Sequence, residues 1–134
     1  MTVTGKEYIS RIDNLHNEVW IDGKRIEGKI SEHPAFRGVL KSKAALYDLS
    51  NYNKDTFTFS SPVVNSEVNF AFQQPKTKED LENRFVATKK WAQTNLGLLG
   101  RSPDYVNTGI MALGVANSIF HEDKKNYETN IFNI

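Results

Sequence analysis

The sequence predicts a mainly helical, α+β domain with one or two short β-hairpins. Three observations support this class: apolar residues recur at helical spacing in several stretches, capping residues precede those stretches, and two intervals place turn residues between β-type segments. The length of 134 residues and the hydrophobic content of 39% suit one packed domain. No repeat or Gly/Ser-rich linker interrupts the chain, so we expect residues 1–134 to form a single helix-rich domain.

Two helices are expected in the first half of the chain. The first covers residues 4–15 and begins with Thr4 and Glu7 at the spacing of a capping box. The second begins at residues 31–34, a segment that places a proline in the first turn, and runs to about Ser50. Its apolar stripe consists of Phe36, Val39, Leu40, Leu46, Tyr47 and Leu49.

Two hairpins are expected between the helices. Asp22 and Gly23 lie between two β-type triplets, and both residues tolerate the positive φ of a type I′ turn. Further along, aromatic residues alternate in 57–59 and again in 68–72, and residues 60–65 supply the turn chemistry between them.

Two more helices are expected in the second half. Thr77 and Asp80 open the first of them with Ser/Thr-x-x-acid spacing. Its expected buried face consists of Leu81, Phe85, Ala92 and Leu96, broadened by Trp91. Gly97 and Gly100 mark a corner, and residues 102–104 begin the last helix with a capping serine, a proline and an acid.

The last helix is expected to carry apolar residues as far as Phe120. Its small residues would let another backbone come close; they are Gly109, Ala112 and Gly114. A new apolar pattern starts at residues 131–134 and then stops. We interpret the interruption of this pattern as a sign that the sequence is a fragment of a longer chain.

Composition excludes several classes of protein. Seventeen basic and sixteen acidic residues give a net charge of +1, which offers no basic surface for nucleic acid. With no cysteine, the chain supplies no disulfide, thiolate metal site or cysteine nucleophile. We find no apolar signal segment and no long apolar run, so we expect no membrane span and a cytoplasmic location.

One short segment, residues 100–105, has the composition of an anion site. Arg101 precedes a helix start and Tyr105 follows it by about one turn, so both could lie beside backbone N–H groups without helical acceptors. A permanent cation, a phenol and a helix N-terminus together suit an oxygen on which negative charge develops. The alternative is a surface pair of Arg101 and Asp104, with Tyr105 in the core.

Histidines and metal ligands give no comparable pattern. His16, His33 and His121 lie far apart and lack the spacing of metal ligands, so we expect no metal site. His33 precedes a proline and is expected to shape a helix start, and His121 lies in a charged run. Phosphate-binding glycine loops and zinc-protease motifs do not occur.

Several segments occur in an order that resembles one family. They are TGKEY at 4–8, VWIDG at 19–23, EHPAFR at 32–37, LYDL at 46–49, QP at 74–75, KEDL at 78–81 and GRSPDY at 100–105. Together they resemble the N-terminal region of the 4-hydroxyphenylacetate 3-monooxygenase oxygenase components. This likeness covers residues 4 to about 120.

The resemblance implies a fold, a reaction and partners. It implies the helical N-terminal domain of an acyl-CoA dehydrogenase-like flavoenzyme that assembles as a tetramer. It also implies ortho-hydroxylation of a phenol with O2 and reduced FAD, which a separate NADH-dependent flavin reductase supplies. Arg101 and Tyr105 would bind the substrate near its phenol oxygen and act in catalysis. Most flavin contacts would lie outside this chain, so the isolated chain is expected to bind FAD poorly and to be inactive.

Two alternatives stay open at this stage. The chain could be a non-catalytic helical domain that serves in folding or assembly, or the parent oxygenase could act on a different phenol. A related branch, the 4-hydroxybutyryl-CoA dehydratases, holds a [4Fe–4S] cluster with some cysteine ligands near the position of Arg101. The absence of cysteine here disfavours that branch.

Overall fold

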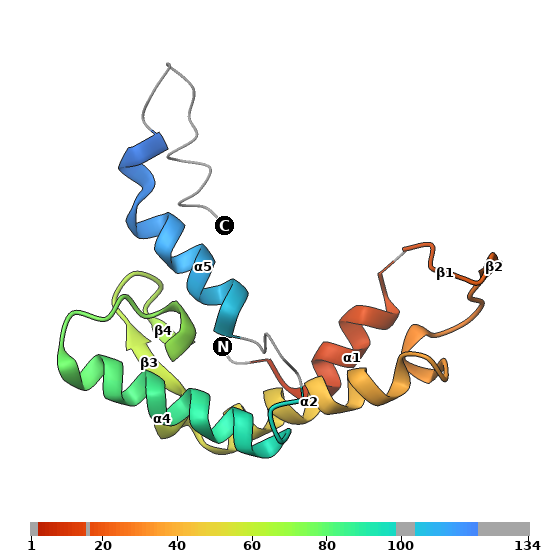
Figure 1. The fold of residues 1–134 in the computed structure, drawn as a ribbon, viewed down its shortest axis with the longest axis horizontal. Coiled ribbons are helices and arrows are strands. Elements are labelled where there is room, and N and C mark those ends of the chain that lie inside the picture. The colour runs from red at the N-terminus through yellow and green to blue at the C-terminus, as the bar shows by residue number, and fades with distance from the viewer. Residues whose placement is uncertain (1–2, 16, 99–103, 121–134) are drawn as a thin grey trace. The chain divides into compact units, whose positions relative to one another are not determined.

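The computed structural model describes residues 3–15, 17–98 and 104–120 (Figure 1). The chain forms two compact units, residues 1–54 and 55–134. The α-helices are α1 (Gly5–Asp13), α2 (Arg37–Tyr52), α3 (Lys54–Phe57), α4 (Lys78–Thr94) and α5 (Asp104–Val115). The 3-10 helices are η1 (Ile30–Glu32), η2 (Phe70–Phe72) and η3 (Asn117–Phe120). The strands form two antiparallel hairpins, β1 (Trp20–Ile21) with β2 (Lys24–Arg25) and β3 (Thr58–Ser61) with β4 (Ser66–Asn69).

Local signals define the start of the first unit as the sequence predicts. The Thr4 hydroxyl accepts a hydrogen bond from the Glu7 amide at 3.2 Å, and the Glu7 carboxylate accepts one from the Thr4 amide at 2.7 Å, which completes the capping box of α1. Asp22 and Gly23 have φ values of 50° and 75°, so the β1–β2 turn is the expected one.

The packing of α1 on α2 depends on a close approach at Gly5. The Gly5 amide donates to the Asp48 carboxylate at 2.8 Å, and the Tyr8 and Tyr47 rings stack with centroids 4.8 Å apart. A Cβ atom at Gly5 would lie 2.5 Å from the Ala44 carbonyl oxygen and 2.6 Å from the Asp48 carboxylate. Only glycine therefore fits where the two helices meet.

The second helix begins later than predicted. α2 starts at Arg37, and η1 and a turn occupy the residues expected to begin it. The physical reason is that Ser31 does not cap a helix: its amide and hydroxyl both donate to the Asp13 carboxylate, at 3.0 and 2.6 Å. His33 then shapes the turn as expected, because its Nδ1 accepts from the Ala35 amide and its carbonyl from the Arg37 amide.

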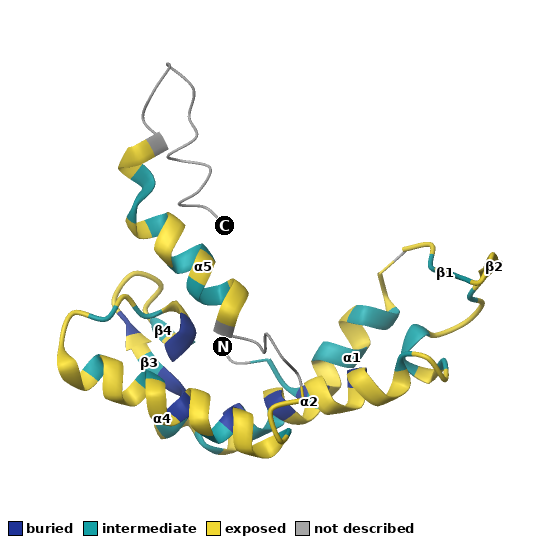
Figure 2. Ribbon diagram, viewed as in Figure 1, coloured by how far each residue is buried: buried dark blue, intermediate teal, exposed yellow. Residues whose placement is uncertain are grey.

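The β3–β4 hairpin is shorter than the aromatic alternation predicts. Phe57 ends α3 and Phe70 begins η2, so both aromatic residues lie just outside the strands. In this position Phe57 is fully buried and its ring stacks on Trp91 of α4 at 5.0 Å. The buried residues of this unit lie on α4, on η2 and around β3 (Figure 2); the apolar ones are Phe57, Phe70, Ala71, Ala87 and Trp91.

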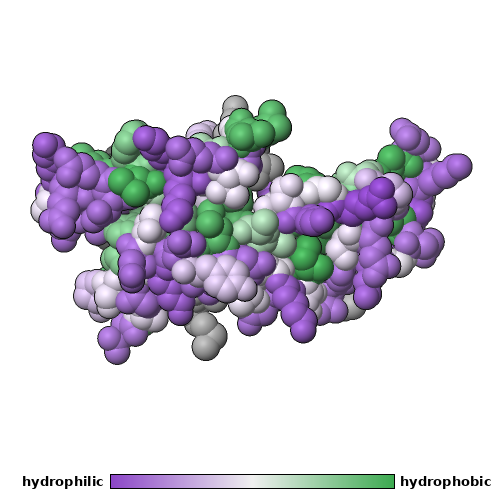
Figure 3. Space-filling view, turned by 90° about the horizontal axis from the view of Figure 1, so that it is seen from below, coloured by the Kyte–Doolittle hydropathy of each residue, from purple (hydrophilic) through white to green (hydrophobic). Residues whose placement is uncertain are grey.

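The face of α4 that packs inward is not the predicted one. Leu81 and Phe85 are 56% and 66% exposed, and Leu96 lies beyond the helix end with φ of 54°. Ala87 and Trp91, one turn apart, are buried instead because they meet the Phe57 and Phe70 region. Hydrophobic residues consequently reach the surface among hydrophilic ones (Figure 3).

The last helix is also shorter than expected. α5 ends at Val115 and η3 follows, so the predicted continuous helix to Phe120 is interrupted at Ala116. A Cβ atom added at Gly109 or Gly114 would meet nothing within 4 Å, so no backbone of the described residues approaches there. No helix in the described part of the chain is long and apolar enough to cross a membrane.

The N-terminus of α4 is fixed by one carboxylate. Asp80 accepts hydrogen bonds from the backbone amides of Lys76 at 2.8 Å and Thr77 at 2.9 Å, and from the side-chain amide of Gln73 at 2.9 Å. These bonds, the two backbone amides foremost, lower the pKa of Asp80 from its ordinary value of 3.8. The predicted capping box with Thr77 is present as well.

We predict that Gly5→Ala destabilises the chain, because the added Cβ would overlap the Ala44 carbonyl. Overpacking of this kind costs about 1–3 kcal/mol. The matched control is Gly38→Ala in α2, where the added Cβ meets nothing within 4 Å. Alanine there should leave the stability unchanged or raise it slightly, because the site has room and glycine has more freedom to lose on folding. Urea unfolding of the 134-residue chain measures both, and equal effects would refute the close approach at Gly5.

A second prediction concerns acid unfolding. Because the pKa of Asp80 is lower in the folded chain, its contribution to stability is present above the ordinary value of 3.8 and is lost as the pH falls through the folded pKa. Asp80→Asn should therefore lower the melting temperature at neutral pH and flatten its fall below about pH 4.

Glu82→Gln is the control for this series, since Glu82 makes only an exposed ion pair with Lys78 at 3.4 Å. Its melting curves should follow those of the unchanged chain at every pH. If the melting temperature falls equally steeply below about pH 4 in the unchanged chain and in Asp80→Asn, the assignment is contradicted.

Candidate functional site

The structure describes one of the two predicted site residues. Tyr105 lies in the first turn of α5 and is 60% exposed. This exposure contradicts the alternative that buries Tyr105 in the core. Arg101 lies outside the described residues, so its position beside Tyr105 stays a prediction.

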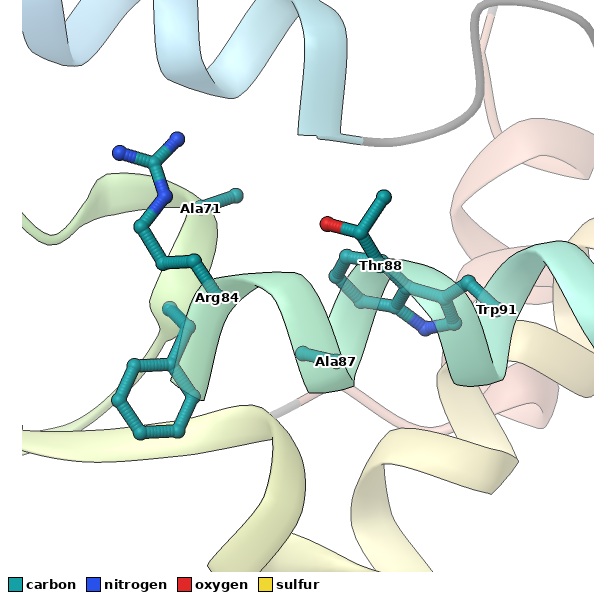
Figure 4. A pocket seen from close by; sticks show the side chains of 6 residues that line it. Ala71, Arg84, Ala87, Thr88 and Trp91 are labelled. Atoms are coloured by element: carbon teal, nitrogen blue, oxygen red, sulfur yellow. The ribbon is translucent and has the colours of Figure 1, made fainter. Parts of the chain in front are cut away.

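A polar clamp holds α5 against the rest of its unit one turn after Tyr105. We use this name for Arg84 of α4 and Thr108 of α5. The Arg84 guanidinium donates through Nη2 to the Thr108 hydroxyl at 2.8 Å and through Nη1 to the Gln73 carbonyl at 3.3 Å. The Thr108 hydroxyl donates in turn to the Ala71 carbonyl at 3.4 Å. Figure 4 shows Arg84 extending from α4 toward α5, with Ala71 beside it.

A small pocket lies next to this clamp. It is lined by Phe70, Ala71, Arg84, Ala87, Thr88 and Trp91 (Figure 4). Its volume of about 10 Å³ is near the minimum for one water molecule, whereas sites for organic ligands measure several hundred Å³. This pocket therefore does not fit a flavin or a phenol. The Trp91 indole nitrogen is buried and has no hydrogen-bond partner among the described residues.

The histidines do not assemble a site in the part of the chain that can be described. His33 packs its ring against Phe36 at 5.9 Å and accepts the turn hydrogen bond given above. His16 and His121 lie outside the described residues. Among the residues with described positions, no three His, Cys, Asp or Glu side chains come together as metal ligands.

Local sequence patterns do not predict a role for Arg84 or Thr108. Their contact joins residues 24 positions apart, so no local spacing predicts it. One signal was present: Thr108 follows Tyr105 by three residues, so both lie on the same side of a helix. A polar residue at that position, on a helix otherwise rich in apolar residues, indicates a partner on a neighbouring element.

Comparison with known proteins gives a consistent result. Residues 4–134 match the family described as 4-hydroxyphenylacetate 3-hydroxylase N terminal. The chain is 40% identical over 126 residues to the probable 4-hydroxyphenylacetate 3-monooxygenase of Bacillus subtilis (strain 168), covering 92% of this chain and 26% of that protein. It is 41% identical over 130 residues to the 4-hydroxyphenylacetate 3-monooxygenase oxygenase component of Geobacillus sp. (strain PA-9), covering 97% of this chain and 26% of that one.

A solved structure supports the same assignment. The oxygenase component of 4-hydroxyphenylacetate 3-monooxygenase, complexed with FAD and 4-hydroxyphenylacetate, aligns with a TM-score of 0.86 at 37% identity. The alignment covers 98% of this chain and 26% of that chain. It confirms the mainly helical N-terminal fold with short hairpins that the sequence predicts. The chain spans about a quarter of the length of these relatives, and it belongs to the 4-hydroxyphenylacetate 3-hydroxylase N-terminal family.

Proposed function

We propose that this chain is the N-terminal part of a flavin-dependent monooxygenase that hydroxylates 4-hydroxyphenylacetate, or a similar phenol, ortho to its hydroxyl group. The observation that carries the proposal is the match over residues 4–134, together with the 0.86 TM-score to an oxygenase component that binds FAD and 4-hydroxyphenylacetate. In this proposal residues 1–134 form one helical domain of the longer enzyme.

Arg101 and Tyr105 are the proposed substrate-binding and catalytic residues. The support is the GRSPDY segment and the exposure of Tyr105 at the start of α5. The guanidinium and the phenolic hydroxyl of these residues would both donate to the oxygen of the substrate phenol. Stabilising negative charge on that oxygen enriches the ortho carbon in electrons, which favours its attack on an electrophilic oxygen. Arginine suits this role because its guanidinium stays charged and donates in fixed directions.

The cofactor we propose is reduced FAD, which supplies the electrons that activate O2 when it is bound. The relatives are named as oxygenase components, which supports a separate NADH-dependent flavin reductase as partner. The chain spans about a quarter of its relatives, so the residues that hold the flavin are proposed to lie mostly in the remaining three quarters of the enzyme. The tetramer and the cytoplasmic location expected from the resemblance stay predictions.

The site predicts how single substitutions act in the full-length enzyme. Tyr105→Phe and Arg101→Ala should each lower kcat for hydroxylation by about 100-fold, the effect of losing one donor to a developing oxyanion. Arg101→Lys should recover only part of the loss, because an ammonium lacks the planar fork. Stopped-flow hydroxylation assays with 4-hydroxyphenylacetate measure these effects.

Tyr52→Phe is the matched control for Tyr105→Phe. It also removes a phenolic hydroxyl, from a side chain that is 86% exposed on α2, and it should leave the kinetics unchanged. Unchanged kcat and substrate affinity in both Tyr105→Phe and Arg101→Ala would refute the site. Repeating the assay with phenols that differ at the para position tests the alternative of another substrate.

The isolated chain is expected to be inactive. It spans about a quarter of its relatives, so most of the flavin contacts are proposed to lie outside it. Fluorescence titration of the 134-residue chain with FAD should show weak binding, and assays with reduced FAD should show no turnover. Tight, stoichiometric binding would contradict this prediction and place the flavin contacts within residues 1–134.

A further inference from the structure

We propose that the polar clamp, Arg84 and Thr108, positions Tyr105 for the substrate. The inference rests on the proposed function, because it assigns Tyr105 to the phenol oxygen. Neither clamp residue is proposed to touch the substrate. They act through α5, whose first turn carries Tyr105.

The clamp joins three elements through directional bonds. The two Nη atoms of Arg84 bind different acceptors, the Thr108 hydroxyl of α5 at 2.8 Å and the Gln73 carbonyl after η2 at 3.3 Å. Thr108 is therefore both acceptor and donor, since its hydroxyl also donates to Ala71 of η2. A lysine in place of Arg84 could not reproduce this arrangement, because its ammonium lacks a planar fork.

Gln73, whose carbonyl accepts a hydrogen bond from Arg84, is itself held in place. The Gln73 side chain donates to Asp80, which caps α4, and the Gln73 amide donates to the Phe70 carbonyl at 3.0 Å. The Gln73 carbonyl therefore belongs to a residue whose backbone and side chain both donate hydrogen bonds of their own. The Arg84 guanidinium is therefore bonded to an acceptor whose own position is fixed.

The position of Thr108 on α5 makes the clamp relevant to Tyr105. Residues three apart on an α-helix are neighbours on one side and differ in height by about 4.5 Å. Anchoring the Thr108 hydroxyl therefore sets both the rotation of α5 about its axis and its displacement along the axis. Both quantities determine where the Tyr105 hydroxyl lies.

Apolar packing alone does not fix α5 to the same degree. No residue of α5 with a described side chain is fully buried, and Tyr105 and Val106 are each 60% exposed. Hydrophobic contacts are non-directional, whereas the bond from the charged Arg84 guanidinium to the Thr108 hydroxyl is short, at 2.8 Å, and oriented. The clamp is thus the feature of this unit best suited to defining the orientation of the helix.

The test is a double-mutant cycle in the full-length enzyme. Thr108→Val keeps the shape of the side chain and removes its hydroxyl, and it should lower kcat by about 10-fold through misplacement of Tyr105. More of the O2 consumed should then appear as H2O2 rather than as hydroxylated product. Thr108→Ser keeps the hydroxyl and should restore both values to within about twofold. Arg84→Lys should resemble Thr108→Val.

The cycle separates positioning from general stability. If the clamp acts through Tyr105, Thr108→Val should change kcat less than about twofold when Tyr105→Phe is already present, since coupled residues are not additive. Equal losses in both backgrounds, or failure of Thr108→Ser to restore activity, would show a structural role only and overturn the proposal. Circular dichroism confirms that the variants are folded.

The outcomes also distinguish this inference from the proposed function. If Tyr105→Phe is impaired while Thr108→Val and Arg84→Lys behave as the unchanged enzyme, the clamp proposal fails and the proposed function stands. If Tyr105→Phe is itself unimpaired, the role of Tyr105 fails, and positioning through it fails as well.

Discussion

The stacking of Trp91 on Phe57 decides how the second unit is arranged. Phe57 is fully buried at the end of α3, and Trp91 is 4% exposed near the end of α4, with ring centroids 5.0 Å apart. This contact selects the face of α4 that turns inward. Arg84 lies seven residues before Trp91, about two helical turns, and therefore on nearly the same face. The aromatic pair thus directs Arg84 toward η2 and α5.

The features of the fold that could be predicted from the sequence are those decided within a few residues. The capping boxes at Thr4 and Thr77 and the turn at Asp22 and Gly23 all occur as predicted, because each forms from neighbouring backbone and side-chain groups. The predicted start of α2 is wrong because Ser31 donates a hydrogen bond to Asp13, which is 18 residues away. No local spacing contains that contact.

The face of α4 shows a second limit of sequence patterns. Apolar periodicity indicates that a side of a helix can be covered, but it does not say by what. Leu81 and Phe85 follow the period and stay exposed in the described residues, whereas Trp91, expected only to broaden the stripe, occupies the centre. Which face of α4 is buried depends on Phe57. The sequence pattern predicts this residue in a strand, whereas the structure places it at the end of the short helix α3.

The candidate site, like the fold, has residues that a local sequence pattern indicates and residues that it does not. Tyr105 could be proposed from the sequence because a helix start, an arginine and a tyrosine occur within six residues of one another, and because the surrounding segments resemble one family. Arg84 and Thr108 could not, because their bond spans 24 positions and depends on how α4 and α5 pack. The position of an exposed tyrosine depends on what orients its helix, and α5 has no fully buried side chain among the described ones. A directional bond from the partly buried Arg84 to the neighbouring Thr108 can supply that orientation while the Tyr105 side chain stays 60% exposed.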